Sequence, residues 1–275
     1  MVSKKLPLLI LVSLFSVLIY GQNQERSPSQ NIISQAVQPY LFSVNTLTAD
    51  SPIWSIDYSG GYGERVEDPF GYEGVDQQVA VKGYLGNRFT LYARAAFGFP
   101  DGGSVSSAQQ AEVIRDIIGG EKTLGFRLGL GLGGRFDYEN VGAATGRITA
   151  SYDTSFWRLN GNLLFEKAFS DDRDAIDIIT SIGFQYRIFG NFYAGAEALG
   201  EDLEGFWDDE EAEGGAKVLV GPSLNLTPNA SRFSFSLCGG PVIYATQSQM
   251  QPSEAIRDLP QKNGFTVRAS ILYNL

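Results

Sequence analysis

Apolar and polar residues alternate with a period of two along most of the chain after Pro52. The clearest example is the C-terminal stretch, whose apolar face consists of Phe265, Val267, Ala269, Ile271, Tyr273 and Leu275. A period of two is typical of a β-strand with one apolar face. Similar stretches recur through the chain, and they are long enough to cross a bilayer when tilted.

The turns between these stretches allow the strands to be counted. Short turns such as Gly86-Asn87 and Gly190-Asn191 contain residues that accept the positive φ angles of tight hairpins. Outer-membrane barrels place their short turns at one end and usually have an even number of strands. Counting back from the C-terminus predicts twelve strands, at 53–63, 75–85, 88–98, 108–118, 123–134, 144–153, 156–169, 176–189, 192–200, 216–227, 231–246 and 264–275. Ten strands is the alternative, if two short segments are loops.

The stretch from 104 to 120 fits either a helix or a strand. A helix would have an apolar face formed by Val105, Ala108, Ile114 and Ile118. It would also move the turn at Gly86-Asn87 to the wrong end of the barrel. A strand at 108–118 keeps every short turn at the same end, so we predict a strand.

The N-terminus has the pattern of a secretory signal peptide at residues 1–21, with Lys4 and Lys5 before an apolar core that ends at Tyr20. Residues 22–52 are polar and mixed, and we expect a mostly unstructured periplasmic lead-in. Residues 53–275 form the third predicted part, an all-β, antiparallel up-and-down transmembrane β-barrel. A soluble sandwich also alternates, but the strand length and the export signal favour a barrel in the cell outer membrane.

Composition excludes several classes of function. The net charge of −10 argues against a nucleic-acid partner, because binding phosphates requires a basic face. The chain has no histidine, the most common general base and metal ligand, and a single cysteine, Cys238, which lies on the polar face of its strand. We therefore expect no enzyme activity, no cofactor and no metal site. The expected partners are outer-membrane lipid and, through the C-terminal strand, the barrel insertion machinery.

If the apolar faces meet lipid, the opposite faces line the lumen. The charged residues predicted to line it are Lys82, Arg94, Arg127, Arg158, Glu166, Arg187, Glu197 and Arg268. Opposite charges are nearly balanced, which fits either a network of ion pairs that fills the barrel or a narrow aqueous path. Both interpretations stay open, although the glycine row from Gly125 to Gly133 favours open space along one wall.

The predicted loop at 200–215 is strongly acidic. Its acids are Glu201, Asp202, Glu204, Asp208, Asp209, Glu210, Glu211 and Glu213. Oxygen-rich clusters suit Ca²⁺, so this is a candidate cation-binding loop, although the spacing matches no EF-hand. The sequence favours the other interpretation, a solvated surface loop.

The second half of the chain carries a rhythm of strands and turns in "WRLNGNLLFEKAF", "GFQYRIFGNFYAGAEALGE" and "VGPSLNLTPNASRFSFSLCGGPVIY". This rhythm resembles a family of outer-membrane barrels named for the MetA pathway of phenol degradation. The resemblance implies a transporter-like barrel for small aromatic or apolar compounds, and it assigns no functional residue. The leading hypothesis is a passive channel or uptake path for small solutes of unknown identity. The second is a sealed structural or surface-binding barrel that acts through its external loops.

Overall fold

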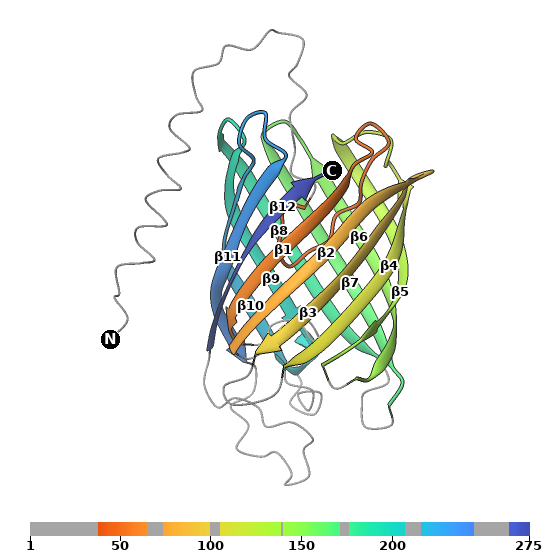
Figure 1. The fold of residues 1–275 in the computed structure, drawn as a ribbon, viewed down its shortest axis with the longest axis vertical. Helices are drawn as coiled ribbons and strands as arrows, with labels where there is room; N and C mark the ends of the chain where they lie inside the picture. The colour runs from red at the N-terminus through yellow and green to blue at the C-terminus, as the bar shows by residue number, and fades with distance from the viewer. Residues whose placement is uncertain are drawn as a thin grey trace, which may run out of the picture.

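The computed structural model describes residues 38–64, 74–99, 105–138, 140–170, 176–206, 216–244 and 264–275. They form a closed barrel (Figure 1) whose strands are β1 (Trp54–Gly63), β2 (Gly74–Gly86), β3 (Phe89–Phe99), β4 (Ser106–Ile118), β5 (Gly125–Phe136), β6 (Gly142–Asp153), β7 (Trp157–Ala168), β8 (Asp177–Phe189), β9 (Phe192–Glu201), β10 (Lys217–Leu226), β11 (Phe233–Tyr244) and β12 (Gly264–Asn274). A short 3-10 helix, η2 (Leu203–Phe206), follows β9. Among the described residues, no helix is long and apolar enough to cross a membrane.

Each strand pairs antiparallel with its neighbours along the chain, and β1 pairs with β12 to close the barrel. In the closing seam Tyr58 lies opposite Ile271. The prediction of twelve antiparallel strands is confirmed. The ambiguous stretch 108–118 is a strand within β4, because residues there alternate between the two faces of the barrel wall.

The two ends of the barrel differ. The shortest connections, at 87–88 and 190–191, lie at one end, which we call the turn end; the opposite end is the loop end. Asn87 and Gly190 have positive φ angles of 49°, which tight hairpins require. The C-terminus also lies at the turn end, where the Leu275 N–H donates a hydrogen bond to the Trp54 carbonyl at 2.8 Å (Figure 1).

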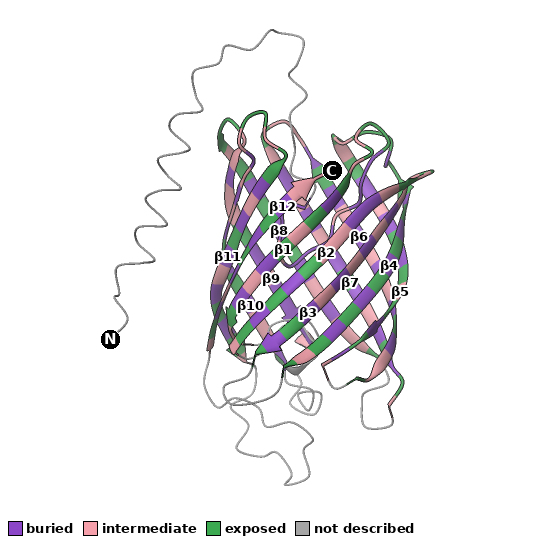
Figure 2. Cartoon of the chain, in the orientation of Figure 1, coloured by how far each residue is buried: buried purple, intermediate pink, exposed green. Residues whose placement is uncertain are grey.

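Exposed and buried residues alternate along every strand (Figure 2). On β5, for example, the outward side chains of Leu130 and Leu132 are 50% and 77% exposed, whereas the inward Arg127 is buried. Large apolar side chains dominate the outer surface, among them Val79, Ile182, Phe184, Leu237 and Ile271. An apolar exterior on a closed barrel is what the hydrocarbon region requires, because closure leaves no unpaired strand edge.

Residues 38–50, which we call the lumen segment, run inside the barrel (orange in Figure 1). This differs from the periplasmic lead-in expected at 22–52. The physical reason is that Tyr40, Phe42, Val44 and Leu47 are almost completely buried, while the polar inner wall satisfies the backbone groups between them. The expected signal peptide (1–21) and the rest of the lead-in (22–37) lie outside the described residues.

Candidate functional site

Glu197 is the main acceptor for the start of the lumen segment. Its Oε2 accepts hydrogen bonds from the backbone N–H groups of Leu41 and Phe42, both at 2.9 Å. Its other oxygen, Oε1, accepts the Ser223 hydroxyl at 2.5 Å. A buried carboxylate is stable only when its oxygens are satisfied, and here the lumen segment supplies two of the three donors.

Asn162 holds the next part of the lumen segment through two hydrogen bonds, one to the N–H and one to the carbonyl of Val44. The Val44 N–H donates to Asn162 Oδ1 at 2.6 Å, and Asn162 Nδ2 donates to the Val44 carbonyl at 2.9 Å. The same Oδ1 also accepts a hydrogen bond from Arg147 at 3.0 Å, and Arg147 forms an ion pair with Glu112 at 2.8 Å. The side-chain amide thus replaces the backbone partner that an adjacent strand would offer.

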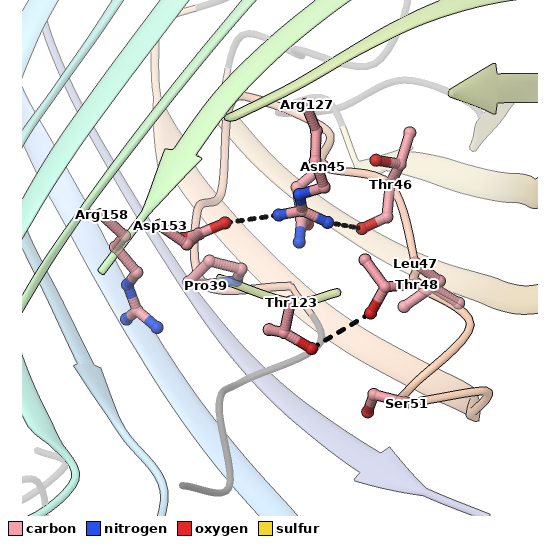
Figure 3. A pocket seen from close by; sticks show the side chains of 10 residues that line it. All are labelled: Pro39, Asn45, Thr46, Leu47, Thr48, Ser51, Thr123, Arg127, Asp153 and Arg158. Atoms are coloured by element: carbon pink, nitrogen blue, oxygen red, sulfur yellow. Dashed lines mark hydrogen bonds and ion pairs between the residues drawn. The ribbon is translucent and has the colours of Figure 1, made fainter. Parts of the chain in front are cut away.

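Basic residues of the wall bind the oxygen atoms of the lumen segment. Lys82 Nζ donates to Gln38 Oε1 at 2.6 Å and to Asn45 Oδ1 at 2.7 Å. Arg127 donates to the Thr46 carbonyl at 2.8 Å and is ion-paired with Asp153 (Figure 3). Lys82 and Arg127 therefore both bind the lumen segment, and Arg127 also pairs with an acidic residue of the wall.

Arg158 is 2% exposed and lies at the centre of a second group of contacts. Its guanidinium donates to Gln185 and to Asn225, the latter at 2.9 Å, and its Cζ lies 4.0 Å from the centroid of the Tyr193 ring. The Tyr40 hydroxyl donates to the Arg158 carbonyl at 2.8 Å. Burial raises the pKa of Tyr40, so this phenol stays neutral and acts as a donor.

The lumen segment leaves the barrel at the turn end through Asp50. The Asp50 carboxylate accepts hydrogen bonds from the Thr48 hydroxyl at 2.7 Å and from the backbone N–H and hydroxyl of Thr123 at 3.0 and 2.8 Å. Burial raises the pKa of Asp50, but these hydrogen bonds outweigh it and the net pKa lies below the ordinary value. The carboxylate is therefore charged when it holds the turn between β4 and β5.

A small pocket of about 40 Å³ lies between the lumen segment and the wall. Figure 3 shows its lining, in which Thr48 and Thr123 face each other below Arg127. Such a volume holds water but no solute. The lumen segment and the polar side chains around it thus leave this pocket too small for a solute.

In the loop half of the lumen, charged side chains pair with each other. Arg135 pairs with Glu166, and Arg268 pairs with Asp76 at 2.7 Å. Arg94 donates to Gln110 at 3.1 Å. These ion pairs join strands two apart around the barrel, β5 with β7 and β12 with β2, and they keep the buried charges compensated.

The other side of the loop half is apolar. Side chains from β7 to β11 and one residue of the lumen segment form a buried group, the apolar lumen cluster, made of Phe42, Leu164, Ile179, Leu199, Leu219, Cys238 and Val242. The alternation of each strand directs these residues inward, although apolar side chains were expected only on the lipid face. The lumen therefore has a charged side and an apolar side.

Most of the residues predicted to line the lumen are buried on the inner wall: Lys82, Arg94, Arg127, Arg158, Glu166, Glu197 and Arg268. Arg187 is different, because it is half-buried at the turn end with its Cζ 5.1 Å from the centroid of the Phe156 ring. The register between β8 and β9 shifts at Arg187 and Phe189, which interrupts the alternation on which the prediction depended.

The expectation of open space along the glycine row of β5 is wrong at Gly129, Gly131 and Gly133, whereas a Cβ atom added to Gly125 would have no neighbour within 4 Å. A Cβ atom added to Gly131 would lie 2.9 Å from the Ile114 side chain, and one added to Gly129 would lie 2.6 Å from the Thr149 hydroxyl. Neighbouring side chains therefore fill the space that these glycines leave.

The acidic loop is described only at its start. Glu201 belongs to β9 and its carboxylate pairs with Lys217 at 2.6 Å. Asp202 follows, and Glu204 lies in η2. The other candidate ligands, Asp208, Asp209, Glu210, Glu211 and Glu213, lie outside the described residues. Within the described part of the chain, no three His, Cys, Asp or Glu side chains are grouped as metal ligands.

Sequence reasoning missed several residues that hold the lumen segment, chiefly Asn162, Gln185, Asn160 and Thr90. The alternation along the strands places these residues on the inner face of the barrel. It does not show what they contact, because the segment was expected outside the barrel. One signal was available: residues 40–47, "YLFSVNTL", are rich in apolar side chains for an unstructured lead-in.

Neither a family model nor a curated protein sequence matches the chain. Among solved structures, the chain is similar to the KdgM porin in complex with disordered oligogalacturonate, with 12% identity over 80% of this chain and 99% of that one and a TM-score of 0.52. It is similar to the NanC porin, with 10% identity, coverages of 80% and 100% and a TM-score of 0.54. It is also similar to an outer-membrane channel from Pseudomonas putida F1, with 8% identity, coverages of 91% and 100% and a TM-score of 0.51. The chain therefore has the twelve-stranded barrel fold of outer-membrane porins and channels, and the proteins that share this fold with it here are channels rather than enzymes.

Proposed function

We propose that the protein is an outer-membrane channel for small solutes and that the lumen segment closes it in this conformation. The observation that carries the proposal is the way the segment is held. Wall residues such as Glu197, Asn162 and Lys82 each bind it through two side-chain hydrogen bonds to its backbone or side-chain atoms. Once the segment leaves, the same donors and acceptors line an aqueous path that a polar solute can follow.

The exterior of the barrel supports a location in the outer membrane. Large apolar side chains dominate its outward surface, and closure of β1 on β12 leaves no free edge. In this proposal the signal peptide at 1–21 directs export, and the C-terminal strand engages the barrel insertion machinery.

Small aromatic or apolar compounds are the substrate class that the resemblance to the MetA-pathway phenol-degradation barrels implies. The apolar lumen cluster supports it, because Leu199, Leu219 and Val242 give the loop half of the lumen an apolar wall that a purely polar solute does not need. Phe42 of the lumen segment packs in the same cluster as these residues.

Conductance in planar bilayers tests the channel. We compare the native protein with a variant in which residues 38–48 are replaced by alternating glycine and serine, which keeps the chain length but removes the buried anchors. The variant should give frequent open steps, whereas the native protein should be mostly closed. The Lys122→Gln variant, which changes an exposed residue of the β4–β5 turn, should behave like the native protein. A folded replacement variant without open steps would contradict the proposal.

A sealed structural barrel is the second candidate, and the filled lumen favours it. Arg158, Gln185 and Asn225 form a continuous hydrogen-bonded group that would close a path even without the segment. The bilayer experiment separates the two functions, since a sealed barrel stays closed in both proteins.

A further inference from the structure

Arg115 is a charged side chain on the apolar outer surface of the barrel. It points outward from β4 and is exposed. The outward residues before and after it on the same strand, Val113 and Ile117, are 39% and 50% exposed. On β3 it lies directly opposite Phe89. The guanidinium of Arg115 is thus placed among apolar side chains that face lipid.

No carboxylate compensates the charge of Arg115 within the described part of the chain. The guanidinium lies instead beside an aromatic ring, with Cζ 5.2 Å from the centroid of the Phe89 ring. The arginines of the lumen differ, because Arg147 and Arg268 are ion-paired there. A charge that faces lipid without a partner is costly unless an oppositely charged group of the membrane meets it.

The position of Arg115 along β4 brings its charged head to the membrane surface. Arg115 is close to Ile118, where β4 ends at the turn end. Long arginine side chains extend along apolar surface until their head reaches the interface, where a cation costs much less than at the bilayer centre. The guanidinium therefore lies at the level of the phospholipid headgroups.

Two further cations belong to the turns at this end of the barrel. Arg88 is in the β2–β3 turn, and its carbonyl accepts a hydrogen bond from the N–H of Asp116 at 3.1 Å, which fixes this turn next to Arg115. Lys122 is exposed in the β4–β5 turn. The acid of that turn, Glu121, is already paired with Arg88 at 2.5 Å. We call Arg88, Arg115 and Lys122 the β3–β4 basic patch.

An arginine beside an aromatic ring recurs elsewhere at the turn end. Arg187 Cζ lies 5.1 Å from the centroid of the Phe156 ring, and Arg232 donates to the Tyr273 hydroxyl at 3.5 Å. Neither arginine forms an ion pair with a described residue. A ring holds the guanidinium by a cation–π contact and leaves N–H groups available for an anion of the membrane.

The phosphate of a lipid matches the donors of the patch. A guanidinium presents its N–H groups in a planar fork that binds two phosphate oxygens. A zwitterionic headgroup would bring its own ammonium group against Arg88 and Lys122, whereas an anionic headgroup leaves a net negative charge for them. A free phosphate ion gains nothing from Val113 and Ile117, which in a membrane meet the acyl chains below the headgroup.

We propose that the β3–β4 basic patch is a binding site for an anionic phospholipid, in which Arg115 holds the phosphate and Arg88 and Lys122 attract the rest of the headgroup. This inference rests on the proposed location in the outer membrane and not on the solute path. The bound phosphate compensates the charge of Arg115 and anchors the turn end of the barrel at the membrane surface.

Native mass spectrometry of the full barrel tests the site. The probes are phosphatidylglycerol and phosphatidylcholine with identical acyl chains, added in equal amounts to the purified protein in a nonionic detergent. The native protein should carry phosphatidylglycerol in preference. Arg115→Gln should lower this preference about fivefold, the effect of removing one cation from the surface of an anionic membrane.

Lys167→Gln is the matched control, since Lys167 is also outward and exposed but lies near the loop end of β7. Its lipid preference should equal that of the native protein. An unchanged preference in folded Arg115→Gln would overturn the site. An equal loss in Lys167→Gln would do the same, because net charge rather than the patch would then select the lipid. Displacement of phosphatidylglycerol by inorganic phosphate, with the ionic strength matched by sodium chloride, would also count against it, since the site would then be one for a free anion.

A second variant keeps the proposal testable if Arg115→Gln does not fold. The double variant Arg88→Gln with Lys122→Gln leaves Arg115 and its ring contact in place and removes the two cations of the turns. It should also lower the preference for phosphatidylglycerol, and full retention of that preference would refute the role of the patch. The two proposals fail separately, because lipid binding in detergent reports on the patch whereas conductance in bilayers reports on the channel.

Discussion

At the scale of single residues, the inner wall uses two kinds of partner for the backbone of the lumen segment. Glu197 offers a charge that accepts two N–H groups, whereas Asn162 offers a neutral amide that both accepts and donates. The hydrogen bonds to the charged group are the stronger ones, and removing their partner leaves buried donors unsatisfied. The identity and parity of both residues could be read from the sequence, but the segment that they hold could not.

Asp50 makes the attachment of the lumen segment dependent on pH. Its pKa is lowered in the folded state from an ordinary value of 3.8, so its contribution to stability is complete above that value and is lost as the pH falls through the lowered pKa. We expect the Thr123 amide, which donates to Asp50, to stay protected from hydrogen exchange at neutral pH and to lose protection only in strong acid. Hydrogen exchange followed by NMR measures this.

The Asp50→Asn variant is the control for this prediction. It removes the titrating group, so exchange at Thr123 should no longer show the acid transition. An identical transition in this variant would assign the pH dependence to another group.

At the scale of elements, β5 shows how a strand of alternating leucine and glycine fits the barrel. Its leucines face lipid, and its glycines accept the side chains of neighbouring strands, as Ile114 of β4 covers Gly131. The sequence predicts the strand and its faces, because alternation is a local property. It does not predict that the glycine side is filled, because the filling atoms come from β4 and β6.

Adding a side chain to the inner glycines should therefore destabilise the barrel. Gly131→Val places a Cβ atom 2.9 Å from Ile114, and we expect the free energy of unfolding to fall by about 1–3 kcal/mol through overpacking. Urea titration of the refolded protein, monitored by heat-modifiable migration in gels, measures the change. Gly146→Val is the matched control, since a Cβ atom there has no neighbour within 4 Å. Equal loss in both variants would show that the contact with Ile114 is not responsible for the destabilisation.

At the scale of the whole molecule, the barrel is inverted relative to a soluble protein. Apolar side chains cover its outside, and charged pairs such as Arg268 with Asp76 lie inside. This arrangement is stable only where hydrocarbon surrounds the barrel.

A charge on the outer surface should be costly according to its depth. Leu130 lies near the middle of β5 and is half exposed. Leu130→Lys should therefore destabilise the barrel in vesicles, lowering its free energy of unfolding by about 2–4 kcal/mol. Ile118 is equally exposed but ends β4 at the turn end, and Ile118→Lys should cost about 0–1 kcal/mol. Urea titrations in lipid vesicles compare the two variants. Similar losses would contradict the placement of the barrel in the membrane.

The amino-acid sequence by itself determined the twelve strands, their boundaries to within a few residues and, for most of the charged side chains, the face on which they lie. These features depend on neighbours in the chain, because a period of two and the φ angles of tight turns are local. Only the tertiary structure decided that residues 38–50 lie in the lumen. This placement depends on partners far apart in sequence, as Leu41 and Glu197 are separated by 156 positions, and no local pattern specifies such a pairing.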